Sequence, residues 1–144
     1  MTLYLDGYCL QSPNLTQIEG LGSLSKLKEL TLHFVDSRQL TDLSALAALG
    51  NLRNLQKLTM NFADCTRLDD LAALGRMEEL QKLEHLALDF ARCWQLVDAS
   101  ALVAIGRLQK LKQLALRLAL RCCARLLKDS ERVREQSFTK PVQI

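Results

Sequence analysis

One short phrase recurs along this chain at an interval of 28 residues. The stretch LTMNFADCTRLDDL, residues 58–71, is nearly repeated as LALDFARCWQLVDA, residues 86–99. The same interval carries Leu30 forward to Leu58, Leu86 and Leu114. A repeat of this length is one supersecondary unit that cannot bury its own apolar face, so neighbouring units must stack. We therefore expect a chain built from similar units that lie side by side.

Each unit begins with a strand and continues into a short helix. Apolar residues alternate at Leu58, Met60 and Phe62, which is the period of a strand. In every unit an acidic or amide residue then precedes an Ala- and Leu-rich stretch of about two helical turns. The side chains of these acidic and amide residues suit helix N-caps, because their oxygens accept hydrogen bonds from the first free amides of a helix. These residues are Asn14, Asp42, Asp70 and Asp98.

The ends of the helices also have a regular pattern. Glycine recurs at Gly22, Gly50 and Gly106, which predicts left-handed residues that terminate the helices. Leucines continue beyond them at every third position, and this spacing drifts around an ideal α-helix. We therefore expect each helix to end in a turn that leads into the next strand. The first strand, near Leu3 and Leu5, begins a unit that is one residue shorter, and a fifth strand is expected at 114–118.

Composition restricts the class of protein. The 144 residues are 49% hydrophobic, which is enough for about one globular domain with a core. Aromatic residues make up only 5%, so few side chains could stack on nucleobases, and nucleic acid is an unlikely partner on this ground. No apolar run approaches the roughly 18 residues of a membrane span, and the first residues do not resemble a secretory signal. We expect an intracellular, cytoplasmic protein with no transmembrane segment.

The cysteines do not suggest a disulfide framework or a metal site. Their number, five, is odd, and none of them forms a C-x-x-C pair. Cys65 and Cys93 occupy matching repeat positions, where small buried thiols that fill a turn are the common case. We predict inert packing for both, no metal ligands and no cofactor.

The repeated stretches LQKLTMNFADCTRLDDLAAL and LEHLALDFARCWQLVDASAL resemble leucine-rich repeats, and their cysteine phrase is similar to the cysteine-containing subclass. The resemblance covers residues 3–118. It implies an arc with strands on the concave side and helices on the convex side, used for binding proteins. We predict an α/β fold, a right-handed leucine-rich-repeat solenoid with about five parallel strands, short outer helices and a C-terminal capping helix.

Strand alternation predicts three rows of side chains on the concave face, since equivalent residues of neighbouring strands lie side by side. The rows are Glu29, Lys57, His85 and Gln113; Thr31, Thr59, Ala87 and Ala115; and His33, Asn61, Asp89 and Arg117. The middle row is small and flat, which favours a surface that accepts a protein partner over a pocket for a small-molecule substrate. The ten polar members of these rows are the predicted partner-binding residues. The alternative is a merely solvated sheet face.

A catalytic role is not expected. His33 and Asp89 belong to strands two apart, so roughly 10 Å separates their backbones, and no buried base or nucleophile converges on either. We predict no catalytic residues and no enzyme activity. Trp94 follows Cys93 at a turn, where we expect partial burial; the alternative is a binding hot spot.

Three segments are predicted: a repeat domain at 1–118, a capping helix at 119–136 and a flexible tail at 137–144. In the second segment apolar residues share one side of a helix and basic residues the other. This pattern favours a cap on the last unit. An acidic partner, an anionic membrane or nucleic acid remains the alternative for its basic side.

The first strand is expected to be an open edge with unpaired backbone groups. Either the sequence is a fragment of a longer repeat protein, or its own features blunt the edge, or another chain covers it by self-association or assembly. The predicted function is a non-catalytic protein-interaction module. The alternative function is a structural subunit or self-associating scaffold piece that contacts partners through this N-terminal edge.

Overall fold

The computed structural model describes residues 1–6 and 15–118, which form an α/β fold with one parallel sheet. Five strands lie in the order β1-β2-β3-β4-β5, and each pairs in parallel with the next. The strands are β1 (Thr2–Asp6), β2 (Glu29–His33), β3 (Lys57–Asn61), β4 (His85–Phe90) and β5 (Gln113–Leu118). The helices between them are η1 (Thr16–Ser23), η2 (Ser44–Asn51), η3 (Ala72–Glu79) and η4 (Ser100–Arg107). The predicted parallel strands and short helices are confirmed.

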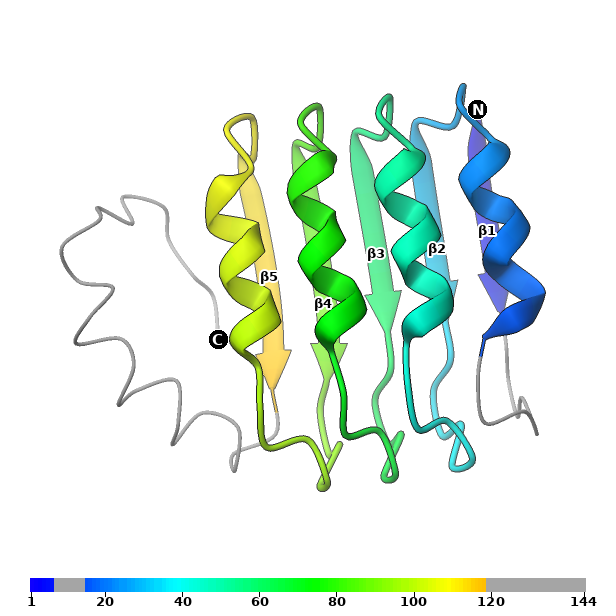
Figure 1. The fold of residues 1–144 in the computed structure, drawn as a ribbon, viewed down its shortest axis with the longest axis vertical. Coiled ribbons are helices and arrows are strands. Elements are labelled where there is room, and N and C mark those ends of the chain that lie inside the picture. Colours follow the sequence, from blue (N-terminus) through cyan, green and yellow to red (C-terminus); the bar gives the residue numbers. More distant parts are fainter. Residues whose placement is uncertain (7–14, 119–144) are drawn as a thin grey trace, which may run out of the picture.

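All four helices cover the same face of the sheet, and the opposite face of the sheet carries none of them (Figure 1). The core lies between these two layers. It consists mainly of equivalent leucines, of which Leu30, Leu58 and Leu86 are buried under β2, β3 and β4. The register pairs these three residues directly, so each repeat covers the apolar side chains of its neighbour.

The helices are 3-10 helices, and this explains the leucine spacing. Leu46 donates its amide to the Leu43 carbonyl, and Leu52 and Leu55 each bond to the residue three positions earlier. A 3-10 helix has three residues per turn, so residues three apart lie on one face. Leucines at every third position, which would drift around an α-helix, therefore all lie on one buried face here.

The predicted acidic residues do meet the first amides of the helices. The Oδ1 atoms of Asp42, Asp70 and Asp98 accept hydrogen bonds from Ser44, Ala72 and Ser100 at 2.9, 2.6 and 2.8 Å. Each acid lies two residues before its helix, one position earlier than an N-cap. Hydrogen bonds from the Ser44 side chain and amide lower the pKa of Asp42.

The predicted left-handed glycines are wrong, because no described glycine has a positive φ. The helices end instead at residues such as Leu52, with φ −79° and ψ 57°. The repeated glycines have a packing role. A Cβ atom on Gly22 would lie 2.7 Å from the Ala48 carbonyl oxygen, and one on Gly50 would lie 3.2 Å from that of Arg76. Glycine thus allows neighbouring helices to approach closely.

The left-handed residues occur in the turn after each strand. Asp36, Asp64 and Arg92 have φ values of 58°, 64° and 60° and are spaced by the repeat interval. Beside these turns, the buried rings of Phe34, Phe62 and Phe90 stack with centroids 5.5 Å apart. The phenylalanine stack therefore holds successive turns together at the ends of the strands.

Three predictions concern residues that lie outside the described part of the chain. They are the capping helix at 119–136, the tail at 137–144 and the N-cap at Asn14.

Replacement of the middle ring of the stack should destabilise the fold. Phe62→Ala removes a fully buried ring that packs on both sides, and we expect a loss of about 3–5 kcal/mol in the free energy of unfolding. Urea denaturation followed by circular dichroism measures it. Phe62→Leu should cost clearly less. A cost below about 1 kcal/mol for Phe62→Ala would contradict the role of the stack.

The cap at η3 can be tested against its own neighbour. Asp70→Ala removes the acceptor of the Ala72 amide and should lower the free energy of unfolding by about 1 kcal/mol. Asp69→Ala is the matched control, because this adjacent acid is also exposed and its side chain makes no hydrogen bond to the described residues. Equal thermal melts for the two variants would contradict the role of Asp70.

Candidate functional site

The open face of the sheet carries the predicted rows. The strand register places Glu29, Lys57, His85 and Gln113 side by side, and does the same for the middle and third rows. Their side chains are exposed or half-buried, whereas the intervening residues of β2, β3 and β4 are buried toward the helices. The sequence thus predicted the positions of all three rows correctly.

The first row is polar and lies where the strands begin. His85 Nδ1 is 2.9 Å from Gln113 Oε1, and the Thr2 hydroxyl donates to Glu29 Oε2 at 3.3 Å. Lys57 is exposed between Glu29 and His85 and forms no ion pair with the described residues. Its ammonium group is therefore available to a partner.

The side chains of the middle row are short at Thr31, Thr59, Ala87 and Ala115. The row has a further member in β1 that was not among the predicted residues. Tyr4 is in register with Thr31, is 56% exposed, and ends the row with a large ring. This ring meets His33, with centroids 5.2 Å apart and Tyr4 Oη 3.2 Å from His33 Nδ1. The alternation of Tyr4 with Leu3 and Leu5 was the signal that could have revealed it.

The third row is largely occupied by contacts within the protein. Asn61 Oδ1 accepts the Ala63 amide at 3.0 Å, and Asp89 Oδ1 accepts the Ala91 amide at 2.9 Å. Asp89 also pairs with Arg117 at 3.0 Å. Asn61 and Asp89 therefore shape the turns that follow their strands, as Asn and Asp commonly do.

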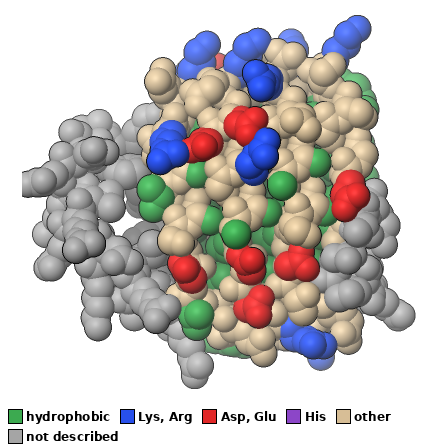
Figure 2. Space-filling model, viewed as in Figure 1, with side chains coloured by type: hydrophobic (Ala, Val, Ile, Leu, Met, Phe, Trp, Pro, Cys, Tyr) green, Lys and Arg blue, Asp and Glu red, His purple; other side chains and the backbone are tan. Residues whose placement is uncertain are grey.

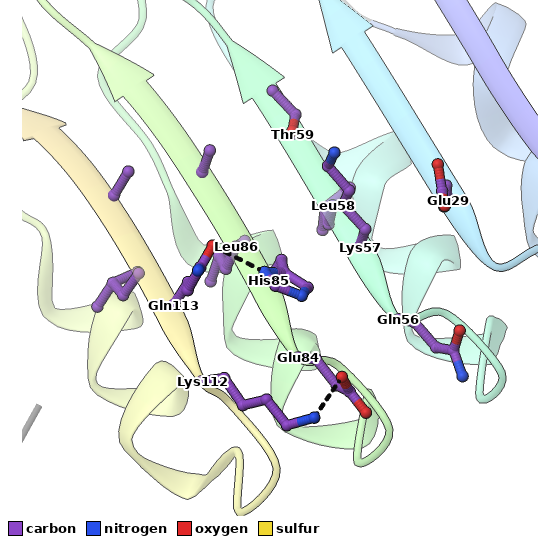
Figure 3. Close-up of a pocket in the computed structure, with 13 residues that line it drawn as sticks. Glu29, Gln56, Lys57, Leu58, Thr59, Glu84, His85, Leu86, Lys112 and Gln113 are labelled. Atoms are coloured by element: carbon purple, nitrogen blue, oxygen red, sulfur yellow. Dashed lines mark hydrogen bonds and ion pairs between the residues drawn. The ribbon is translucent and has the colours of Figure 1, made fainter.

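A broad, open hollow of about 780 Å³ lies on the sheet face (Figure 3). Thr59, Ala87 and Ala115 contribute its small side chains, and Lys57 and His85 line it from the first row. It extends to Gln56, Glu84 and Lys112 just before the strands, where Lys112 Nζ lies 2.7 Å from Glu84 Oε2. These three flanking residues were not among the predicted site residues.

The structure does not bring His33 and Asp89 together. His33 is in register with Asn61, which is in turn in register with Asp89, so β3 separates the two residues. His33 contacts Tyr4, and Asp89 contacts Arg117. Among the described residues, no group of three His, Cys, Asp or Glu side chains is arranged to hold a metal ion.

Cys65 and Cys93 are buried free thiols in the turns after β3 and β4. Each donates a hydrogen bond at 3.1 Å to a backbone carbonyl of the preceding repeat, at Phe34 and Phe62. Burial raises the pKa of Cys65 to about 11 and that of Cys93 to about 12. Thiols in this state are poor nucleophiles, so their packing role is supported.

Trp94, for which partial burial was expected, is an exposed side chain with 48% of its surface accessible, and Val97 in the same loop is equally exposed. None of the helices within residues 1–6 and 15–118 is long and apolar enough to cross a membrane.

The chain matches no family model and no curated protein.

The two buried thiols should resist modification in the folded protein. At pH 8, iodoacetamide is expected to leave Cys65 and Cys93 unlabelled and to label both after denaturation, as measured by peptide mass mapping. Rapid labelling of either thiol in the native protein would contradict its burial.

The buried thiols should also make stability depend on pH. Because the unfolded thiols ionise near pH 9.0 and the folded ones only at higher pH, the free energy of unfolding should fall as pH rises above 9.0.

Proposed function

We propose that this chain is a leucine-rich-repeat protein that binds another protein through the open face of its sheet, without catalysis. In this proposal the repeats wind as a right-handed solenoid and the open sheet face is the concave side of an arc. The regular register of β2 to β5 supports repeat stacking. Connections between parallel strands that cross one face of a sheet are right-handed in nearly all proteins, which supports the winding.

One observation carries the binding role: a low middle row lies between two polar rows on a face that no described helix covers. Thr59 and Ala87 leave room for a partner to approach the sheet closely. Lys57 in the first row supplies a charge that no described side chain neutralises. Such a face suits a polar interface with a small central strip, which needs no enclosed pocket.

A structural subunit is the second candidate, and the edge strand β1 favours it. Leu3 and Leu5 are only partly buried, whereas their register partners Leu30 and Leu32 are fully buried. An added strand or repeat from another chain would cover these leucines and pair the outer backbone groups of β1. This candidate uses the edge of the sheet and leaves its open face free.

We further propose an intracellular location. The two described cysteines, Cys65 and Cys93, are free thiols, which suits a reducing compartment.

A single substitution in the middle row should separate the two functions. Thr59→Arg fills the low row with a long charged side chain and should reduce capture of the native partner by at least about tenfold. The immobilised chain is incubated with extract of its source cells, and the bound proteins are quantified by mass spectrometry. Val103→Arg, at an exposed position of η4 on the helical side, is the matched control and should leave capture unchanged.

The same capture experiment tests whether the partner binds the edge strand β1. Capture that survives Thr59→Arg, but is lost when Leu3 and Leu5 are both replaced by Lys, would favour the structural subunit. Thermal melts of all variants show whether a loss of capture reflects a loss of fold.

A further inference from the structure

Charge is strongly separated between the two loop edges of the molecule. We define the basic edge as the last helical turns, the loops that follow them and the first residue of the next strand. Within residues 15–118 this edge carries nine Lys or Arg against four Glu, a net charge of +5. In Figure 2, Lys and Arg side chains gather along the upper rim of the helical side. The described part of the chain is nearly neutral as a whole, so only the fold reveals the separation.

Three of the four Glu side chains at the basic edge are neutralised by ion pairs with cations of the same edge. Glu84 pairs with Lys112. Glu79 pairs with Arg76, and Glu78 pairs with Arg107. Six cations there have no carboxylate partner among the described residues: Lys26, Lys28, Arg53, Lys57, Lys82 and Lys110. All six are exposed. The surplus positive charge therefore faces solvent.

The opposite edge, where strands end and helices begin, has the reverse pattern. Its arginines are mostly neutralised, since Arg92 pairs with Asp64 at 2.6 Å and Arg38 with Asp36 at 2.7 Å. Asp42, Asp70 and Asp98 bind helix amides there, so helix capping accounts for much of its acidity.

Helix capping accounts for little of the basic edge, because only Arg76 and Arg107 lie in the last turn of a helix. Lys57 is the first residue of β3, and Lys28 immediately precedes β2, so neither lies in the last turn of a helix. Lys57 also lines the hollow on the sheet face, beside small side chains of the middle row (Figure 3). The positive edge and the hollow are thus one continuous surface.

The local field at this surface is positive. The pKa of Glu84 is lowered, mainly by its hydrogen bond from Lys112, with further contributions from His85 and Lys110. A carboxylate brought into the hollow beside Lys57 would lie near His85 and Lys112, which also line it.

We propose that an acidic segment of a partner protein docks in the hollow and along the basic edge, with Lys57 as its central contact. The inference rests on the proposed function and specifies the chemistry of the partner. Carboxylates would meet the six unpaired cations, while small side chains such as Ala87 and Ala115 let the peptide backbone approach the sheet.

The observations favour protein over nucleic acid. The large exposed aromatic residues of the described chain are Tyr4 in β1 and Trp94 in the loop after β4, and neither belongs to the basic edge. Bases of a single strand would therefore find no ring to stack on there.

Fluorescence anisotropy with a labelled hexaglutamate peptide tests the proposal on the full chain at about 50 mM NaCl, where surface charges are weakly screened. We expect binding that Lys57→Glu weakens by about fivefold or more, because an attraction becomes a repulsion. The matched control is Arg67→Glu, which makes the same change of charge at an exposed cation on the opposite edge. Arg67 has only a hydrogen bond to Gln39, and its replacement should change affinity by less than about twofold.

Three outcomes would overturn the proposal. They are no binding of hexaglutamate by a folded chain, equal weakening by the two substitutions, and tighter binding of a labelled oligothymidylate with the same dependence on Lys57. The last result would assign the surface to nucleic acid.

Capture of the native partner separates this inference from the proposed function. If Thr59→Arg abolishes capture and Lys57→Glu leaves it unchanged, the sheet face binds a partner whose contacting segment is not acidic, and the inference fails alone. If neither substitution affects capture, the proposed function fails.

Discussion

Stacking of equivalent residues across the 28-residue interval is the interaction on which the rest of the structure depends. Leu30, Leu58 and Leu86 are in register and buried, and each is covered largely by the repeats beside it. A single strand and a two-turn helix could not remove these side chains from water. The edges show the same dependence, because Leu3 and Leu114 have a described neighbour on one side only and are just partly buried.

The turns after the strands add a second set of contacts between repeats. The rings of Phe34, Phe62 and Phe90 stack, and the Cys65 and Cys93 thiols bond to carbonyls of the preceding repeat. Asn61 and Asp89 belong to this set, because their side chains bind amides of their own turns. The third row of the open face therefore mainly supports the fold, which leaves the first and middle rows better suited to contact a partner.

The charge pattern connects stability with recognition. Acids just before η2, η3 and η4 bind the first amides of these helices, and stacking places them along one edge. Only Arg76 and Arg107 lie in the last turn of a helix, and the other cations of the basic edge lie in the loops that follow or at the start of a strand. Equivalent positions of successive repeats thus give the whole molecule two edges of different charge. Lys57 begins β3 and Lys28 immediately precedes β2, so both place positive charge where the strands start. Neither residue lies at the end of a helix, so neither compensates a helix dipole.

The sequence alone determined the repeat interval, the five parallel strands and the membership of the three rows, because periodicity specifies which residues share a face. It also predicted the acids that bind the helix amides and the burial of Cys65 and Cys93. Only the tertiary structure decided the form of the helices, the packing role of Gly22, and the left-handed turns at residues such as Asp64. It also decided that Asn61 and Asp89 serve the turns. The physical reason is that a pattern records polarity and spacing, whereas the role of a polar or small residue depends on which backbone atoms the fold brings within its reach.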